Sequence, residues 1–313
     1  MSNNLRVAVI GPFFNAEEHV EPWVSGVAGQ HYSPFKLYLV DDASTDRTPA
    51  LLTAAVSKLS VPFSLTHLVK NSGPAAVRNG AIRQAVEDGA ELILILDADC
   101  RVADDWIQRH VAFHRQRPDI DVMGGAMNGI AQSWIGRADG FCSWFTSVPY
   151  TRSGEVKALH LPTTNMSFKS AVIARAGFFD ESLNTGEDVV FCRKVRQSGG
   201  VLWFQSDIIV THLDRDQRHE AKRHHYRWGL HSYTLSVQAQ GGYYSRLTRI
   251  RNPLILASLV PIIAALNTLL VLFKYTRRKP SVWLHLPWIL LLKWYNAVGV
   301  YRGFLNPSLC RRG

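Results

Sequence analysis

Acidic residues are missing from the last third of this chain. The 313 residues carry 35 Lys and Arg against 25 Asp and Glu, a formal net charge of +10. Residues 221–313 contain 14 of these cations and no acid, so they carry +14 and leave −4 for residues 1–220. Basic and aromatic residues together can bind nucleic acid. Here they alternate with apolar runs of about twenty residues, which favours a membrane surface and no nucleic acid.

Cysteine is scarce, and two common nucleotide-binding motifs are absent. The four cysteines (Cys100, Cys142, Cys192 and Cys310) lie far apart without metal-ligand spacing, which predicts a reducing compartment and no disulfide framework. Neither G-x-G-x-x-G nor G-x-x-x-x-G-K-[ST] occurs, which argues against a dinucleotide dehydrogenase and a P-loop enzyme. The first residues show no secretory signal.

Strand patterns alternate with helix patterns over the first 100 residues. The expected strands are residues 5–11, 36–40, 63–68 and 91–96. The expected helices between them are residues 16–30, 46–58 and 74–88. This order predicts βαβ units, and therefore an α/β fold with a parallel sheet and helices on both faces.

The alternation breaks down after about residue 120. A strand with a Gly break is expected at residues 122–125, and residues 130–160 are aromatic and irregular, which suits a packed sub-core or an acceptor pocket. Further elements are expected as helices at 170–176 and 186–198 and strands at 201–204 and up to 212. We expect three parts: a domain over residues 1–235, a basic linker over 236–252 and a helical region over 253–313.

Two carboxylates follow the most apolar of the expected strands. Residues 91–96 read as a strand buried on both faces, and Asp97 and Asp99 come directly after it. On an extended chain residues i and i+2 lie on the same side, so the two carboxylates could converge on one cation. Ligands of open α/β sheets bind outside the carboxyl ends of the strands. By itself, the D-x-D pattern is also typical of an Asp-rich turn. The other motifs of the chain therefore decide whether it indicates a metal site.

Eight short motifs follow one another between residues 5 and 212. They are VAVIGPFFNAEE (7–18), KLYLVDDASTDRT (36–48), NSGPAAVRNGA (71–81), LDADC (96–100), GG (124–125), TTNMSFK (163–169), GFFDESLNTGEDVVFCRKVRQSG (177–199) and VTH (210–212). In this order and spacing they resemble the inverting family 2 glycosyltransferases, which have the Rossmann-like GT-A nucleotide-sugar-binding fold. Two positions depart from the family pattern: Gly11 replaces a common aliphatic residue, and Thr164 a common Gly.

The resemblance implies a site for a nucleotide-sugar donor, such as a UDP-sugar, and for Mg²⁺ or Mn²⁺. Asp97 and Asp99 would hold the metal together with the diphosphate, and His212 would add a ligand. The residues implied in donor binding are Pro12, Asp42, Asn71, Arg78, Asp97 and Asn165. Arg78 could fork onto Asp99 or the nucleotide, or form a surface ion pair instead. His212 could equally be structural.

The chemistry implied by the resemblance is a single displacement at the anomeric carbon. An acceptor hydroxyl attacks while the nucleoside diphosphate leaves from the opposite face, so one base is needed at the hydroxyl. Asp188 matches the family's base, and Glu187 beside it would shape the acceptor pocket. The alternative is that both acids only favour a helix N-terminus through the macrodipole.

The C-terminal part contains one long apolar run and a broken second one. Residues 253–273 carry no charge and are long enough to cross a bilayer. Residues 282–300 are interrupted by His285, Pro287, Lys293 and Asn296. A spanning hairpin would move the four cations of residues 274–279 away from the cytosol, against the positive-inside rule. A re-entrant or interfacial helix pair avoids this conflict, and a soluble hairpin is the third possibility.

Together these features predict a metal-dependent inverting glycosyltransferase at the cytoplasmic face of the cell membrane. The expected acceptor is a hydroxyl of a lipid-linked saccharide or of a surface polysaccharide. Transfer to a polyprenyl phosphate is the alternative within enzymes, since an anionic acceptor needs no general base. A catalytically silent scaffold of a polysaccharide-export assembly is the alternative outside enzymes, against which Asp42, Asp97, Asp99 and Asp188 speak.

Overall fold

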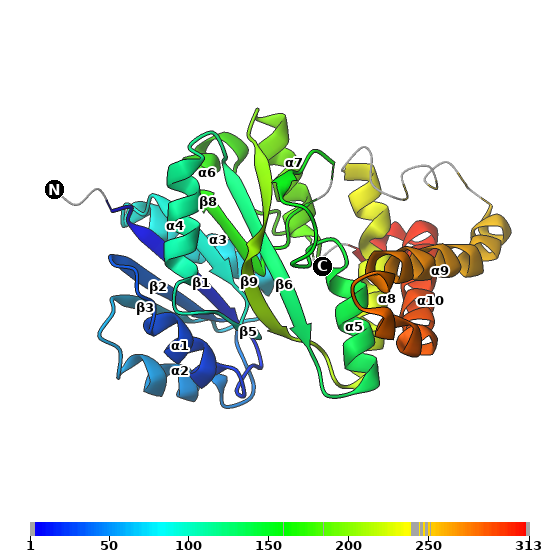
Figure 1. Ribbon diagram of the computed structural model, residues 1–313, viewed down its shortest axis with the longest axis horizontal. Helices are drawn as coiled ribbons and strands as arrows, with labels where there is room; N and C mark the ends of the chain where they lie inside the picture. The colour runs from blue at the N-terminus through cyan, green and yellow to red at the C-terminus, as the bar shows by residue number, and fades with distance from the viewer. Residues whose placement is uncertain are drawn as a thin grey trace. The chain divides into compact units, whose positions relative to one another are not determined.

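The computed structural model describes most of the chain as two units. Described are residues 4–158, 160–183, 185–238 and 252–310, with Tyr244, Leu247 and Ile250 between the last two ranges. Unit 1 comprises residues 1–128, 147–181 and 187–212, and unit 2 comprises residues 129–146, 182–186 and 213–313. Figure 1 labels most elements of both units, each of which is described by itself below.

A parallel half-sheet forms the first half of unit 1, as the sequence predicts. Its strands are β1 (Val7–Phe13), β2 (Phe35–Asp41), β3 (Phe63–His67) and β4 (Leu92–Leu96). β1 pairs in parallel with β2 and β4, and β3 pairs in parallel with β2. All five residues of β4 are buried, because this central strand is covered on both faces.

The second half of the sheet is antiparallel, so the whole sheet is mixed. β8 (Asn165–Lys169) pairs antiparallel with β4 and with β6 (Val122–Ile130). The sheet order over the described residues is β3-β2-β1-β4-β8-β6-β9-β5. The short strands β5 (Cys100–Arg101) and β7 (Gly154–Glu155) both pair with β9. β9 (Leu202–Leu213) is one strand, where the sequence predicts two.

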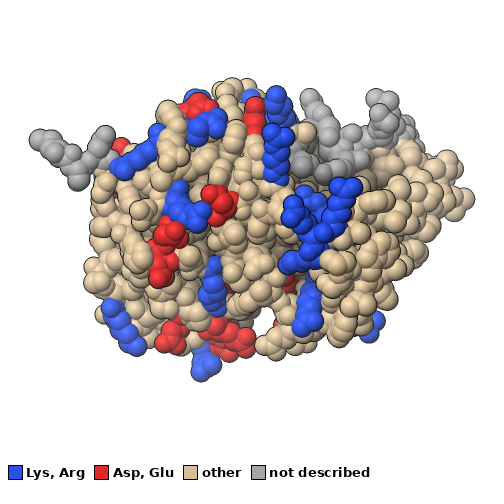
Figure 2. Space-filling model, viewed as in Figure 1, with Lys and Arg blue, Asp and Glu red and all other residues tan. Residues whose placement is uncertain are grey.

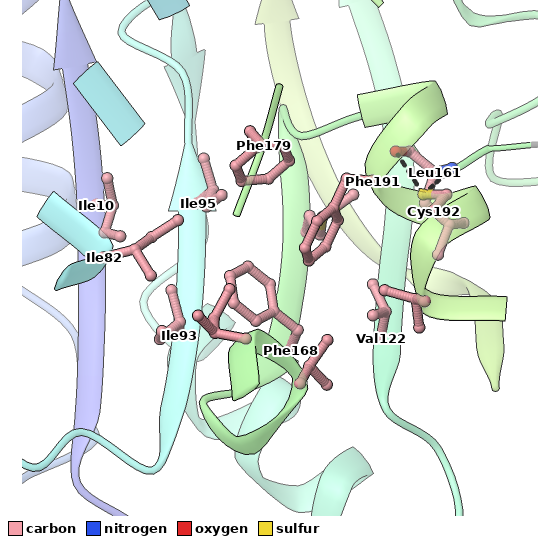
Figure 3. Packing of buried hydrophobic residues seen from close by; sticks show 14 of the residues in the cluster. Ile10, Ile82, Ile93, Ile95, Val122, Leu161, Phe168, Phe179, Phe191 and Cys192 are labelled. Carbon is pink, nitrogen blue, oxygen red and sulfur yellow. Dashed lines mark hydrogen bonds between the residues drawn. The ribbon is translucent and has the colours of Figure 1, made fainter. Parts of the chain in front are cut away.

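Helices cover both faces of this sheet. α3 (Gly73–Glu87), α6 (Ala171–Ala176) and α7 (Glu187–Gln197) share one hydrophobic core with β1, β4 and β8. Figure 3 shows this core, in which Phe191 packs against Phe168 and Phe179 with ring centroids 5.4 and 4.4 Å apart. The dashed lines join Leu161 to the buried Cys192 thiol.

The opposite face is covered by helices that include one absent from the sequence prediction. α1 (Val20–Ala28) and α4 (Trp106–Gln116) lie on the viewer's side of the strands in Figure 1, and α2 (Thr48–Val56) contacts α1. Trp23 and Trp106 are among the largest fully buried side chains. α4 is not among the helices expected from the sequence, although its buried residues Trp106, Ile107, His110, Val111 and His114 recur at helical spacing.

Unit 2 is helical. It contains α5 (Trp134–Trp144), α8 (Arg218–Gln238), α9 (Pro253–Thr276), the 3₁₀ helix η2 (Pro280–His285), α10 (Leu286–Leu305) and the 3₁₀ helix η3 (Pro307–Cys310). The expectation that residues 130–160 are irregular is wrong at α5, where Ser133 caps the helix by accepting a hydrogen bond from Gly136 N–H. The expected boundary at residue 235 falls inside α8, and most of the expected linker 236–252 lies outside the described residues. The three-part division stays a prediction.

Glycines let two helices of unit 2 meet backbone to backbone. A Cβ on Gly229 of α8 would stand 1.9 Å from the Asn296 carbonyl oxygen of α10. A Cβ on Gly299 or Gly303 of α10 would stand 2.2 and 2.0 Å from carbonyl oxygens of α8. Any side chain at these positions would push the helices apart, so this close approach requires glycine.

A buried polar network also joins the helices of unit 2. The Asp139 carboxylate on α5 is completely buried and lies 3.0 Å from His225 Nε2 on α8 and 3.4 Å from Arg215 Nη1. Lys293 on α10 donates to the Cys142 carbonyl oxygen of α5 at 3.2 Å. Buried charges need such partners, because their desolvation is otherwise very costly.

Candidate active site

The candidate site is built around the turn that ends β4. The strand stops at Leu96, and Cys100 N–H donates to the Asp97 carbonyl oxygen at 3.1 Å, which closes residues 97–100 into a turn. Trp23 Nε1 donates to the same carbonyl oxygen at 3.1 Å. Gly11 makes room for this indole, since a Cβ there would lie 2.7 Å from the Trp23 ring. The departure at Gly11 therefore has a structural reason.

This turn corrects the argument that alternation along a strand brings Asp97 and Asp99 together. Both oxygens of Asp97 are held by other side chains: Arg78 Nη2 donates at 2.8 Å and Thr164 Oγ1 at 3.0 Å. A metal at Asp97 would have to share its oxygens with these donors. A joint metal site of Asp97 and Asp99 stays a prediction. Asp97 is the less suitable metal ligand of the two, because both its oxygens already accept hydrogen bonds.

Arg78 links the end of β4 to the start of α7. It projects from α3, is 5% exposed, and its second nitrogen, Nη1, donates to Glu187 Oε1 at 2.5 Å. A surface ion pair and a fork onto Asp99 do not fit the described structure, because Arg78 is buried and bonds the carboxylates of Asp97 and Glu187. Its contact with the nucleotide stays a prediction. Glu187 is itself buried against Arg78, which leaves it little part in an acceptor pocket.

Burial and charge act against each other in this cluster. Burial lowers the pKa of Arg78, but the carboxylates of Asp97 and Glu187 outweigh it and raise that pKa above its ordinary value. Burial raises the pKa of Glu187, which the Arg78 guanidinium only partly offsets. Arg78 thus stays charged at every physiological pH.

Asp188 lies in the first turn of α7, directly after the buried Glu187. Its Oδ1 accepts a hydrogen bond from Val189 N–H at 2.8 Å, and its side chain is 17% exposed. The His160 ring lies near its other oxygen, with Nε2 3.8 Å from Oδ2. Asp188 is therefore ordered by the helix start and still accessible from outside, as a base must be.

Asp99 and His212 form a second polar pair in the site. The strand pairing of Cys100 with His212 brings them together, with Asp99 Oδ2 3.2 Å from His212 Nε2. His19 interacts electrostatically with both residues. Burial lowers the pKa of His19, and the Asp99 carboxylate offsets part of that decrease. Among the described residues no group of three or more His, Cys, Asp or Glu could hold a metal ion by itself. Asp99 and His212 still fit a cation whose remaining ligands are phosphate oxygens, the usual situation of Mg²⁺ beside nucleotides.

Asp42 shapes the loop that begins α3. Its two oxygens accept hydrogen bonds from Ser72 N–H at 2.6 Å and Gly73 N–H at 2.8 Å, while Asn71 Nδ2 donates to the Asp42 carbonyl oxygen at 3.2 Å. Gly73 has φ +80°, a conformation that glycine adopts without strain. The contact of Asp42 and Asn71 with a donor stays a prediction, as does that of the half-buried Pro12 in β1.

Asn165 does not have the freedom that a donor contact requires. It is 1% exposed, and its Oδ1 accepts from Trp106 Nε1 and lies 3.2 Å from His110 Nε2. Its Nδ2 donates to the carbonyl oxygens of Ala126 and Ile208, both at 3.1 Å. The expected role of Asn165 in donor binding is at odds with these contacts, because all its hydrogen-bonding groups serve the sheet and α4.

Three residues of the site were missed from the sequence. Thr164 was noted only as a departure from Gly, yet its hydroxyl bonds Asp97. His160 and His19 lie near Asp188 and Asp99 respectively, and isolated histidines in loops give no signal by type or spacing. Only their positions near the recognised motifs could have suggested them.

Comparison with known proteins identifies the family of this chain. The sequence profile described as Glycosyl transferase family 2 matches residues 8–178, more than half of the chain. The protein is 26% identical to the glycosyltransferase AglE of Haloferax volcanii over 214 residues, which are 67% of each chain. It is 25% identical to the poly(ribitol-phosphate) beta-N-acetylglucosaminyltransferase TarS of Staphylococcus aureus over 61% of this chain, but spans only 32% of that protein.

Solved structures share the fold. The mannosyltransferase PcManGT of Pyrobaculum calidifontis, in complex with GDP-Man and Mn²⁺, superposes with a TM-score of 0.65 at 18% identity, covering 96% of this chain and 88% of its own. S. aureus TarS 1-349 in complex with UDP-GlcNAc superposes with a TM-score of 0.55 at 19% identity, covering 88% and 74%. At such identities the likeness concerns the fold alone. The chain therefore belongs to glycosyl transferase family 2 and is a glycosyltransferase whose mixed α/β sheet has the GT-A fold.

Proposed function

We propose that this glycosyltransferase moves a sugar, with inversion, from a nucleotide sugar to a hydroxyl of a saccharide acceptor. The observation that carries the proposal is the position of Arg78, whose guanidinium bonds Asp97 at the end of β4 and Glu187 at the start of α7. The carboxylate next in the chain, Asp188, stays accessible. One buried cation therefore fixes the donor-side turn and the candidate base in a single arrangement.

The leaving diphosphate is received on the side of Asp99 and His212. Their oxygen and nitrogen, 3.2 Å apart, would hold Mg²⁺ or Mn²⁺ together with phosphate oxygens. Such a cation supplies neutralisation of the charge that develops on the leaving group. Asp97, bonded to Arg78 and Thr164, positions the turn that carries Asp99. The Mn²⁺ bound by PcManGT supports testing manganese first.

The acceptor is activated by Asp188. Its carboxylate takes the proton of the attacking hydroxyl while the new bond to the anomeric carbon forms and the bond to the diphosphate breaks. Glu187 cannot do this work, because its carboxyl group is buried against Arg78. His160 lies beside the Asp188 carboxylate, with its Nε2 3.8 Å from Asp188 Oδ2.

The substrates are proposed by chemistry and by likeness. The named complexes of the similar structures contain UDP-GlcNAc and GDP-Man, so we propose a UDP-sugar as the first donor to test and a GDP-sugar as the second. A lipid-linked saccharide or surface polysaccharide is the proposed acceptor, reached from the cytoplasmic face of the membrane. The apolar helix Pro253–Thr276 near the C-terminus supports association with a membrane.

A thermal-shift panel of nucleoside diphosphates and sugar nucleotides, with and without Mn²⁺, tests the donor site. We expect one nucleobase series to raise the melting temperature only with Mn²⁺, and Asp99→Asn to lose the Mn²⁺-dependent part. Asp207→Asn, which alters an exposed ion pair with Arg109, is the matched control and should behave as wild type. Full Mn²⁺ dependence in Asp99→Asn would refute the metal site. No response to any sugar nucleotide would favour a catalytically silent scaffold.

A further inference from the structure

Helix α9 has an unusual distribution of apolar residues. One face packs inside unit 2 and includes Thr268, with Asn267 beside it donating to Tyr244 Oη at 2.8 Å. The other face is exposed and apolar; its large side chains are Leu254, Ile255, Ile262, Leu266, Leu269, Leu270 and Phe273, each 46–78% exposed. Only 28% of the most apolar window of α9 is buried, so it is no core helix of a soluble protein. Its exposed face is apolar like its covered one, whereas the exposed face of a water-facing helix is polar.

The covered face of α9 is held by protein along its N-terminal half. Val260 and Ala264 of α9 pack with Ala297 of α10 in a separate core cluster. α10 in turn meets α8 through glycine contacts that leave no space between the backbones. α8 exposes Arg223 and Arg227, which cannot enter a bilayer core cheaply. A membrane crossing by the α9–α10 pair would therefore have to carry α8 along or break these contacts.

The surroundings of the exposed face have the chemistry of a lipid headgroup layer. Arg277, Arg278 and Lys279 follow the C-terminus of α9 and are exposed. Trp283 of η2 and Trp294 of α10 are 50% and 45% exposed. Aromatic rings of this kind settle at the membrane–water interface, and cations settle on anionic headgroups. In Figure 2 the surface over α9 is almost uniformly tan, without acidic residues that would repel such a layer.

We propose that α9 lies in the plane of an anionic membrane leaflet and does not cross it. Its exposed face sits among the acyl chains, and its covered face stays on α10. This proposal rests on the membrane association in the proposed function and is independent of the transfer chemistry. At 24 residues and ~1.5 Å per residue α9 is long enough to span a bilayer, so length does not decide. The in-plane position keeps Lys274, Arg277, Arg278 and Lys279 on the same side as the rest of the chain.

Depth measurements distinguish the two positions. Single nitroxide labels at Leu254→Cys, Ile262→Cys, Leu266→Cys and Phe273→Cys, in a full-length Cys310→Ser background, are compared by electron paramagnetic resonance on phosphatidylglycerol-containing vesicles. The remaining cysteines are buried and should not react. An in-plane helix gives similar shallow depths at all four positions. A depth maximum at residues 262–266 with shallow ends would overturn the proposal in favour of a crossing. Arg223→Cys on α8 should stay in water.

Vesicle binding provides the second measurement and its control. Leu266→Glu with Leu270→Glu should weaken partitioning to anionic vesicles by at least about tenfold, since two apolar side chains are lost from the face that enters the acyl chains. Val86→Glu, on an exposed apolar residue of α3, should leave binding unchanged. Equal binding of both variants would overturn the assigned face. Transfer or hydrolysis of sugar nucleotide in detergent, measured on the same samples, shows separately whether the proposed function holds.

Discussion

Each unit contains a buried ionic cluster, and the two differ in one respect. In unit 1 Arg78 is enclosed between Asp97 and Glu187, but the Asp97 side chain remains 25% exposed. In unit 2 Asp139 lies between His225 and Arg215 with a side chain that is 0% exposed. Both clusters satisfy the rule that buried charges are paired. Only the first offers a carboxylate to a molecule that arrives from outside.

The difference shows how similar chemistry can serve two purposes. The cluster around Asp139 fixes the helices α5 and α8 against each other, and its carboxylate is fully buried, so it can contact no substrate. An open cluster fixes a turn and a helix start, and it leaves Asp97 and Asp188 within reach of ligands. We therefore expect substitutions around Arg78 to affect turnover more than stability, and substitutions around Asp139 to do the opposite.

The sharpest test of the open site is Asp188→Asn. The amide cannot accept a proton from the acceptor, so turnover should fall by roughly 10²–10⁴, the usual contribution of general acid–base catalysis. Donor affinity and melting temperature should barely change. Single-turnover kinetics and donor titration measure both. Loss of donor affinity in proportion to turnover would mean that Asp188 positions the nucleotide, and full activity would favour a polyprenyl phosphate acceptor.

The cluster of Asp139, His225 and Arg215 is tested by Asp139→Ala. Removing one partner leaves His225 and Arg215 without their buried carboxylate, which should cost about 3–5 kcal/mol in the free energy of unfolding. Urea titration measures it, and the activity of the molecules that remain folded should be unchanged. Asp207→Ala removes an exposed ion pair and should cost about 0–1 kcal/mol. If the two variants were equally stable, the enclosed cluster would have no structural role.

Buried histidines behind the site add a dependence on pH. Burial lowers the pKa of His114 to about 4 and of His110 to about 3, from an ordinary value of 6.5. Both histidines stay neutral in the folded protein, whereas in the unfolded chain they bind protons below pH 6.5. Their contribution to the free energy of unfolding is therefore complete above that pH and is lost as the pH falls. Each should remove about 1.4 kcal/mol per pH unit between pH 6.5 and 4. The free energy of unfolding, measured at pH 7, 6 and 5, should depend less steeply on pH in His114→Gln than in wild type. The difference in slope should correspond to one bound proton.

The smallest expected effect concerns Thr164, which holds one edge of the open cluster. Thr164→Val removes the hydroxyl that donates to Asp97 and should cost about 1 kcal/mol in stability. Because Asp97 would then be held by Arg78 alone, the affinity for donor should fall as well. Thr164→Ser keeps the hydroxyl and should restore both quantities. A Val variant that matches wild type in donor titration would remove Thr164 from the site.

The sequence predicts the sheet well where strands and helices alternate. The apolar run at residues 91–96 and the motif at residues 71–81 correctly predict β4 and α3, since burial on both faces and helix periodicity leave clear patterns. The pairing of β8 with β4 and β6 joins segments far apart in the chain, and no local pattern encodes it.

Side-chain partners were the less predictable part of the site. Motifs indicate that Arg78 and Glu187 matter, but only the fold shows that they bond each other across 109 positions. The partners of Asn165 could not be predicted for the same reason, because they come from three distant segments, α4, β6 and β9. The network of Asp139 in unit 2 left no trace in any motif.

The glycine contact between α8 and α10 has a consequence for the order in which the chain matures. It joins residues 226–230 to residues 296–303, so it cannot form until the ribosome has made the chain beyond residue 303. Every residue of the candidate site precedes residue 213, and domains generally fold as units from the N-terminus during synthesis. Unit 1 can therefore assemble first, while the face of α9 that packs on α10 is still uncovered. For that interval the emerging helix needs another apolar surface, and a nearby membrane is one that cells provide.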